Sequence, residues 1–408
     1  MTSRYASLSR AELAVLVPEL LLIGQLIDRS GMAWCIAEFG REEMLQIAIE
    51  EWAGASPLYT KRMQKALKYE GVDIITIFKG LQLDIGAPPQ FMDFRYTVHD
   101  RWHGEFHLDH CGALLDVEPM GPDYVRGMCH DIEDPTFDAT ALATNRRCQV
   151  RPIHRPPRVP ADRKPFCAWT VVIDESYPEV GFIPQLDVVG ASHAYRCELD
   201  EIDPSGEGQA DYSGALMSDV DFAGFSHSAL VRIADEVCLQ MHLLMLSFAL
   251  AVRARCDGDA GRERSIRTKS LIGIAGVAAA RIRQALGLSS DAAGALRVLE
   301  LHPLLNPAAY VSVDVSAESA HVHPSPAHED DAWIALVSPA SDLPLQAIAT
   351  AVNPLLRAEV SGDATDWTVR FVETDTPAKE LGEVSVCKIS SGAAWVFEER
   401  KALPLTVV

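Results

Sequence analysis

The spacing of apolar residues predicts that the chain begins with a group of helices. Leucine and isoleucine recur every three or four positions from residue 13 to residue 23, which is the period of one helix face. The same spacing predicts further helices over residues 41–52, 59–69 and 72–83. Pro88 and Pro89 end this region, because proline lacks the backbone N–H that a helix needs.

The next segment alternates apolar and polar residues, which is the period of a β-strand. Phe94, Tyr96 and Val98 alternate with polar residues, and a second run follows a turn near residues 100–104. In that second run, Phe106 and Leu108 lie on one predicted face. The opposite face is predicted to carry Glu105, His107, Asp109 and Cys111. We expect a hairpin here, then a helix from residue 123 into the 130s and strands over residues 148–153 and 166–173.

The order of predicted elements begins again after Phe225. Residues 175–225 lack long periodic patterns and are expected to connect two units, with one hairpin among them. Beyond them we predict helices and strands in the earlier order, namely helices over residues 226–255, 266–286, 292–301 and 345–356, and strands over residues 310–315, 320–323 and 367–372. Short stretches also resemble each other, as residues 367–371 resemble residues 169–173.

These repeats predict an α+β fold made of two tandem similar units. Each unit is expected to be an N-terminal helical bundle followed by a small antiparallel sheet with a helix. The units are residues 1–175 with a Cys/His cluster, a connecting segment over residues 176–225, and a second, degenerate copy over residues 226–408. The alternative is two unrelated α+β domains that share a common order of elements. A duplicated chain predicts either a homodimer or a pseudo-dimer within one chain.

Composition narrows the classes of function. The 408 residues are 48% hydrophobic and carry a formal net charge of −21, which disfavours binding to nucleic acid or to an anionic membrane surface. The apolar stretch over residues 238–252 is short for a bilayer and reads as a buried helix. The first residues do not resemble a secretory signal, and the nine cysteines are an odd number. We therefore expect a cytoplasmic protein with reduced thiols.

Residues 99–154 are the richest stretch for side chains that bind metals or carry chemistry. Imidazole, carboxylate and thiolate groups together are typical of zinc or iron sites, so we predict a divalent metal cofactor. The predicted ligands are His107, His110, Cys111, Cys129 and Cys148. The alternative interpretation is that the polar strand face is simply solvated and that the cysteines pack as small apolar residues. Phosphate-binding loops and the nucleophile elbow of hydrolases are absent from the sequence.

Spaced cysteines give residues 8–175 a family resemblance. The chain resembles the L-2-amino-thiazoline-4-carboxylic acid hydrolase family and, more loosely, the 4-vinyl reductase type of small-molecule-binding domain. The motifs that carry the resemblance are Phe106-His107-Leu108-Asp109-His110-Cys111, Met128-Cys129-His130, Arg147-Cys148-Gln149-Val150, Pro152-Ile153-His154-Arg155-Pro156-Pro157 and Phe166-Cys167-Ala168-Trp169. The doubled chain and the extra histidines near Cys111 depart from the family pattern.

The resemblance implies hydrolytic opening of a small cyclic C–N substrate, a cyclic amidine that carries a carboxylate. A metal-bound water could attack while Asp109 or Glu105 takes the proton. A cysteine could attack instead, with His107, His110 or His130 as the base. The substrate carboxylate would be held by paired N–H donors of an arginine. The candidates are Arg126, Arg147 and Arg151.

Two other classes of function use the same residues. An iron-dependent oxidoreductase or oxygenase would use the histidines and carboxylates as iron ligands. A non-catalytic small-molecule-binding or sensor protein would use the cysteines to hold a structural zinc ion.

Overall fold

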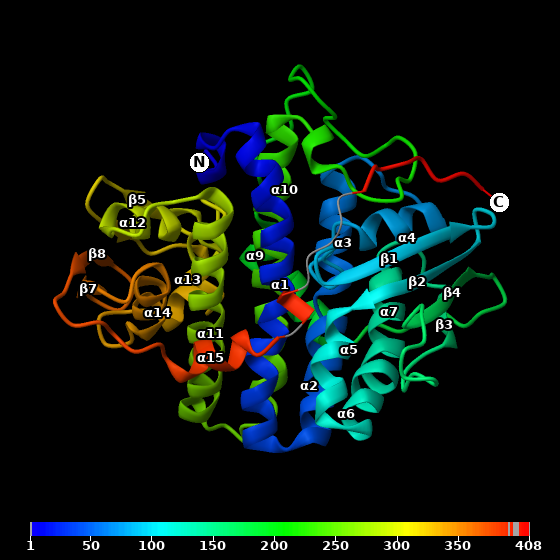
Figure 1. Ribbon diagram of the computed structural model, residues 1–408, viewed down its shortest axis with the longest axis horizontal. Coiled ribbons are helices and arrows are strands. Elements are labelled where there is room, and N and C mark those ends of the chain that lie inside the picture. The colour runs from blue at the N-terminus through cyan, green and yellow to red at the C-terminus, as the bar shows by residue number, and fades with distance from the viewer. Residues whose placement is uncertain (1, 391, 395–399, 408) are drawn as a thin grey trace.

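The protein is an α+β structure in which two small antiparallel sheets flank a central group of long helices (Figure 1). The computed structural model describes residues 2–390, 392–394 and 400–407. Helices take up 51% of the chain and strands 14%. The predicted α+β class is therefore confirmed.

The first half follows the predicted order of helices and then strands. A capping box at Ser9 and Glu12 begins the first helix, since each side chain accepts a hydrogen bond from the other residue's backbone N–H. The helices are α1 (Arg10–Phe39), α2 (Arg41–Ala53), α3 (Ser56–Ala66), α4 (Ile74–Leu81), α5 (Gly112–Val117), α6 (Pro122–Arg126) and α7 (Glu133–Leu142), with a π-helical turn over Gly127–Ile132. The strands are β1 (Met92–Val98), β2 (His103–Cys111), β3 (Cys148–His154) and β4 (Cys167–Ile173). They pair in the order β1-β2-β4-β3.

The connecting segment differs from the prediction. In place of a hairpin it contains the short helices α8 (Pro184–Gly190) and α9 (His193–Arg196). Two isolated bridges involve this segment, one joining Gln209 to Phe225 in parallel and one joining Met217 to Pro404 in antiparallel orientation. Proline at the first helical position suits α8, because the missing N–H has no partner there in any helix.

The second half has a sheet of the same strand order, β5-β6-β8-β7. Its helices are α10 (His227–Arg253), α11 (Ala260–Leu286), α12 (Ala292–Leu301), α13 (Pro326–Glu329), α14 (Leu343–Val352) and α15 (Gly382–Lys388). Its strands are β5 (Val313–Val315), β6 (Ala320–Val322), β7 (Leu356–Gly362) and β8 (Trp367–Glu373). The helix predicted over residues 345–356 ends early, since Pro354 disfavours helical backbone at Asn353, and β7 follows instead.

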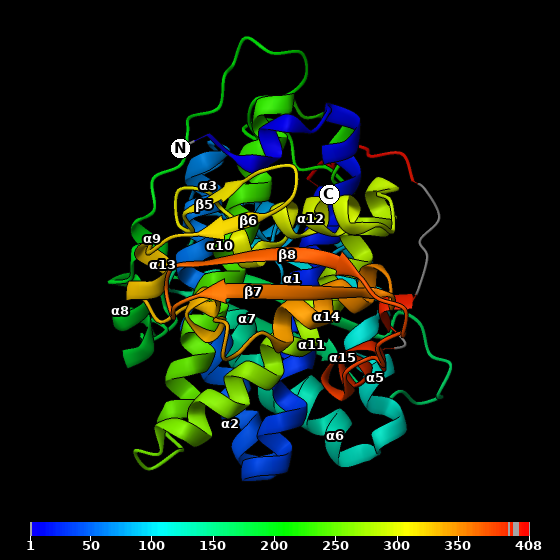
Figure 2. The same cartoon turned by 90° about the vertical axis from the view of Figure 1, so that its left-hand side faces the viewer.

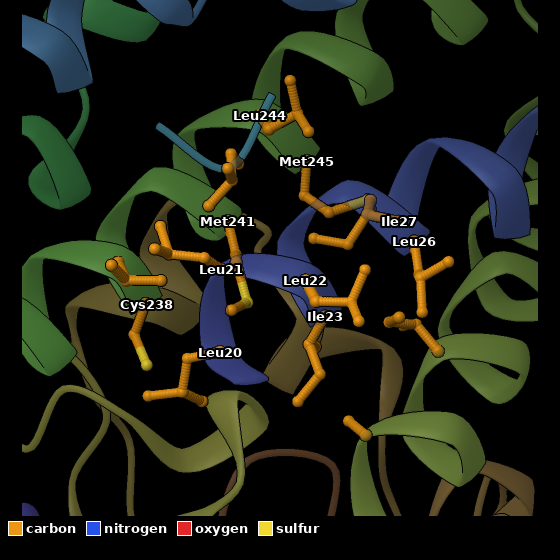
Figure 3. Packing of buried hydrophobic residues seen from close by; sticks show 14 of the residues in the cluster. Leu20, Leu21, Leu22, Ile23, Leu26, Ile27, Cys238, Met241, Leu244 and Met245 are labelled. Atoms are coloured by element: carbon orange, nitrogen blue, oxygen red, sulfur yellow. The ribbon is translucent and has the colours of Figure 1, made fainter. Parts of the chain in front are cut away.

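One continuous apolar core joins the two halves. Side chains of α1 such as Leu21 and Ile23 interdigitate with Met241 and Met245 of α10 (Figure 3). The long helices also contact the opposite half, because α1 packs on α11 and α10 packs on α2 and α3. A two-pronged ion pair strengthens this junction, with the Arg62 guanidinium 2.8 and 3.0 Å from the carboxylate oxygens of Glu236.

Helix α10 is long and apolar enough to cross a membrane by length and composition. Within the protein, 89% of its most apolar window is buried against other elements. It is the one such helix in the described ranges, and its burial agrees with the core helix predicted from the sequence.

Candidate functional site

The polar residues predicted on β2 lie on the outer face of the first sheet. The side chains of Glu105, His107 and Asp109 are 38%, 39% and 45% exposed, and His107 Nε2 lies 3.6 Å from Asp109 Oδ1. Cys111 does not share this face, contrary to the alternation. The strand ends at Cys111, which is buried, and its sulfur accepts a hydrogen bond from Leu114 N at the start of α5.

The five predicted metal ligands are not brought together. On β4, Cys167 pairs with Leu108 while Ile173 pairs with Cys148, so Cys148 and Cys167 lie six residues apart along the strand. That distance is about 20 Å at the usual rise of a β-strand. His107 lies on the exposed outer face, apart from the buried Cys111 and Cys129, which are close enough to each other for the Cys111 charge to raise the pKa of Cys129. The predicted catalytic residue His130 is held by the backbone, since its Nε2 donates to the Pro156 carbonyl at 2.7 Å.

Thiols in the first half are buried and protonated. Burial raises the pKa of Cys111 and of Cys148 to about 12, and it raises the pKa of Cys129 well above its usual value. The acid Glu133 raises the pKa of Cys111 and Cys129 further. Thiolate is the form that attacks carbon or binds metal, so these cysteines are poor nucleophiles in the folded chain. All nine cysteines are free.

His110 is also buried, and its ring lies 6.0 Å from that of Phe166. Burial lowers the pKa of His110 to about 4, with a smaller effect from the Lys164 charge. The imidazole is therefore neutral at pH 7 and can accept a proton only weakly.

The three predicted substrate arginines lie on the surface and do not converge. Arg147 donates to the Tyr177 carbonyl at 2.6 Å, and Arg151 donates to both Asp138 carboxylate oxygens at 2.9 Å. Arg126 is exposed on α6. An anion would have to displace these protein partners, and the three guanidinium groups do not share a pocket.

The structure instead forms a partly open cavity with several polar groups in the first half, between α1, α2, the first sheet and α7. Its volume is about 90 Å³, several times the roughly 10–15 Å³ that one water needs. Residues 133, 136, 137 and 140 of α7 share one helix face and line it. Polar groups in its wall are Gln25, Asp28, Trp52, Tyr59, Asp84, Glu133, Thr136 and Thr140.

Carboxyl groups dominate the chemistry of this cavity. Burial raises the pKa of Glu133 to about 8 and that of Asp84 to about 6, and it also raises the pKa of Asp28. Glu51 lies behind Asp28, and burial together with the Asp28 charge raises its pKa well above the usual value. Among the described residues that line the cavity there is no lysine, arginine or histidine. The acids thus face the cavity without a basic partner in its wall.

Hydrogen bonds fix part of this acidic wall and leave part of it open. The Tyr59 hydroxyl donates to Asp84 Oδ1 at 2.9 Å, and Trp52 Nε1 donates to Asp28 Oδ1 at 3.3 Å. Glu133 Oε2 is buried and has no hydrogen-bond partner in the part of the chain that the structure describes. Buried polar atoms are normally satisfied, and this oxygen is therefore the acceptor in the wall that a bound donor group can reach.

A second compartment adjoins the first, and its wall is mostly apolar but also includes Arg29 and Arg41. Its volume is about 110 Å³, and Asp28, Met128 and Ile132 line both compartments. Met128 and Ile132 come from the π-helical turn, a feature often found at functional sites. Methionines 32, 44, 120 and 128 line the second compartment, and Met120 is 46% exposed, so the compartment reaches solvent.

Sequence reasoning included Glu133 in the rich stretch but missed Asp28 and Asp84. A signal existed, because Gln25 and Asp28 are polar residues one helical turn apart in an otherwise apolar run. Such residues at buried positions are costly unless they are paired or functional.

The ligand-type atoms that do converge belong to two other groups. In the described residues these are His99, His103 and Glu105 at the first hairpin and His321, His323 and Asp366 on the second sheet. Neither contains a predicted metal ligand. Comparisons with protein-family models, curated proteins and solved structures found no significant match to this chain.

Proposed function

We propose that the first half binds a small organic cation, an amine or amidine with an apolar body. The observation that carries this proposal is the set of three carboxyl groups, Asp28, Asp84 and Glu133, in a partly open cavity whose described lining has no basic residue. Arg29 and Arg155 lie outside that lining, and they only partly offset the effect of burial on the pKa of Asp28 and Glu133. Burial holds the proton on Glu133 at neutral pH, and a bound cation would supply the charge that favours the ionised carboxylate.

The two compartments favour a ligand with two different ends. The cationic nitrogen would donate to Glu133 Oε2, which has no partner in the described chain. The apolar body would lie among the methionines of the second compartment, whose flexible side chains adapt to irregular shapes. The net charge of −21 would also raise the local concentration of cations near the surface.

A titration of the full chain with benzamidine and benzylamine tests this proposal. We expect both to bind, with benzyl alcohol and benzoate binding at least tenfold more weakly. Near pH 7, binding should release protons, because the cation favours the ionised form of Glu133, whose pKa burial raises to about 8. Calorimetry in phosphate and Tris buffers would measure that release.

Matched variants identify the site. Glu133→Gln keeps the shape but removes the charge, and we expect it to weaken benzamidine binding at least tenfold. Glu105→Gln is the control, since Glu105 is a partly exposed carboxylate on the outer face of the sheet. If benzoate binds as tightly as benzamidine, or if Glu133→Gln binds benzamidine as well as the native chain, the proposal is wrong.

Hydrolysis of a cyclic amidine is a second candidate, and the raised pKa of Glu133 favours it. A carboxyl group with a pKa of about 8 can exchange protons at neutral pH. Water would add to the amidine carbon, Glu133 would take its proton, and the proton would pass to the leaving nitrogen as the C–N bond breaks. NMR would follow the ring opening of 2-amino-2-thiazoline, and loss of that reaction in Glu133→Gln would support this activity. If the compound binds but is not converted, only the binding proposal is supported.

The carboxylate of the family's substrate would have to displace existing contacts to find a basic partner here. The described lining of the first compartment has none, and in the second compartment Arg29 is paired with Asp116 and Arg41 donates to the Asp123 carbonyl. For that reason the proposal concerns cations without a carboxylate, and the family resemblance stays a prediction. Zinc or iron as a cofactor, the oxidoreductase alternative and the cytoplasmic location also stay predictions.

We also infer that the halves arose by duplication and form a pseudo-dimer within one chain. Support comes from the identical strand order of the two sheets and from the reciprocal packing of α1 on α11 and of α10 on α2 and α3. Because this reciprocal surface is buried inside one chain, we expect a monomer. Light scattering coupled to size-exclusion chromatography measures the mass, and a dimer would contradict the inference.

A further inference from the structure

The outer face of the second sheet gathers two histidines and two aspartates from three adjacent strands. His321 lies on β6 and His323 directly follows it, so the two side chains share one face. Asp314 is opposite His321 on β5. Asp366 directly precedes β8, whose first residue Trp367 pairs with Val322. Figure 2 shows this sheet in front of α11 and α14, with its strands in the order β5, β6, β8 and β7.

The side chains already contact one another. His321 Nε2 lies 2.8 Å from Asp366 Oδ1, and His323 Nε2 lies 2.9 Å from Asp314 Oδ2. The other ring nitrogen of His323 is 3.6 Å from Asp366 Oδ2, and the two imidazole rings are 4.3 Å apart. One ligand atom each from His321, His323 and Asp366 can be chosen so that all lie within 4.8 Å of one another.

We propose that His321, His323 and Asp366 bind a divalent transition-metal ion, with zinc as the reference ion, while Asp314 accepts a hydrogen bond from His323 Nε2 and orients that ring. Imidazole and carboxylate donors suit zinc, whose bonds to nitrogen and oxygen are about 2.0–2.2 Å long. Tetrahedral donors at that bond length are roughly 3.4 Å apart, so small rotations of these side chains would bring them to the ion. The histidines and Asp366 are 31–46% exposed, which leaves room for a water ligand.

The second sheet is favoured over the first hairpin because one of its ligands is already held in place. The first hairpin offers His99, His103 and Glu105, whereas on the second sheet Asp314 accepts a hydrogen bond from His323 Nε2 and fixes the orientation of that ring. The ion would also have a structural effect, because β5 and β6 are only three residues long. Ligands on or next to β6 and β8, with Asp314 of β5 bonded to His323, would tie these short strands together, and an ion that binds only the folded chain stabilises it.

Cobalt provides a direct readout, because Co²⁺ bound by imidazole and carboxylate absorbs visible light. We expect the full chain, stripped with a chelator, to bind one equivalent of Co²⁺ at this site and to release it when zinc is added. Zinc should raise the midpoint of thermal unfolding of the native chain. His321→Gln and His323→Gln should each weaken zinc binding by about 10–100-fold and remove the thermal shift.

His103→Gln is the matched control, since it changes a histidine of the corresponding group on the first hairpin. We expect it to leave zinc affinity at the second sheet unchanged. The substituted histidine side chains are partly exposed. Without metal, thermal unfolding midpoints equal to that of the native chain would show that the variants fold normally. Unchanged zinc affinity in His321→Gln, or a loss seen only in His103→Gln, would overturn the proposal. This site is independent of the cation-binding cavity, so failure of either leaves the other in place.

Discussion

The two halves differ in what lies between the sheet and its covering helix. In the first half, α7 presents Glu133, Thr136 and Thr140 to a cavity. In the second half, α14 occupies the corresponding place in the strand order, and its inner residues Leu345 and Ile348 are apolar and fully buried. The same arrangement of strands therefore encloses a polar space in one half and a packed apolar layer in the other.

The helices beneath the two sheets also differ, since the second half has one continuous helix where the first half has two. Helix α11 is one uninterrupted segment of 27 residues, while the first half has α2 and α3 separated by a break at Gly54 and Ala55. Trp52 and Tyr59, on either side of that break, both line the cavity. The cavity of the first half thus accompanies a break between two helices, whereas the apolar layer of the second half lies on a continuous helix.

Matched isoleucine substitutions should produce the largest difference between the halves. Ile348→Ala removes a fully buried side chain from a packed layer and should lower the free energy of unfolding by roughly 2–5 kcal/mol. Ile132→Ala should cost about 1–2 kcal/mol, because Ile132 already borders empty space on two sides. Urea denaturation of both variants provides the measurement. Equal losses would contradict the contrast between a filled and a hollow interior.

The fold could be predicted from the sequence wherever one face of an element is apolar. Helix α12 was expected over its full length, and both strands of the first hairpin were expected from their alternation. Strand β7 was missed although Leu356, Ala358 and Val360 alternate with polar residues. The apolar run of α14 directly precedes it, and periodicity alone does not locate the boundary between two such patterns.

The cavity could not be predicted because its residues come from distant segments. Asp28 lies on α1, Asp84 follows α4, and Glu133 begins α7. Only tertiary packing brings them together. The alternation on β2 correctly placed Glu105, His107 and Asp109 on one face, but it could not show that this face is the outer one or that the backbone turns into α5 at Cys111.

The pH dependence of the free energy of unfolding should show a difference between the halves that is smaller than that of the isoleucine substitutions. Burial raises the pKa of Glu133 to about 8, so the folded chain holds this proton more tightly than the unfolded chain. Its contribution is therefore fully present below the usual glutamate pKa and is lost as pH rises toward 8. Relative to Glu133→Gln, the native chain should lose up to about 1.4 kcal/mol per pH unit in that interval.

Urea denaturation at pH 5, 6, 7 and 8 would measure this slope for both chains. Asp84 and Asp235 remain in both and should contribute equally, since burial raises their pKa to about 6 and about 7. Glu105→Gln should follow the native slope, because water solvates this partly exposed side chain in the folded chain. Parallel slopes for the native chain and Glu133→Gln would show that Glu133 is not a buried acid in solution.

Thiol reactivity should differ least between the halves, and it decides whether a cysteine can be the nucleophile. The thiols Cys111 and Cys129 of the first half are as buried as Cys238 and Cys387 of the second, and burial raises the pKa of all four. We therefore expect N-ethylmaleimide to label these four cysteines slowly and within about tenfold of one another, as unfolding exposes them. Mass spectrometry of the labelled peptides gives each rate, with the partly exposed Cys197 as the internal reference that reacts first. Much faster labelling of Cys111 or Cys129 than of Cys238 would mean that a thiolate forms in the first half, and the cysteine mechanism would then replace Glu133 as the better account of any hydrolysis.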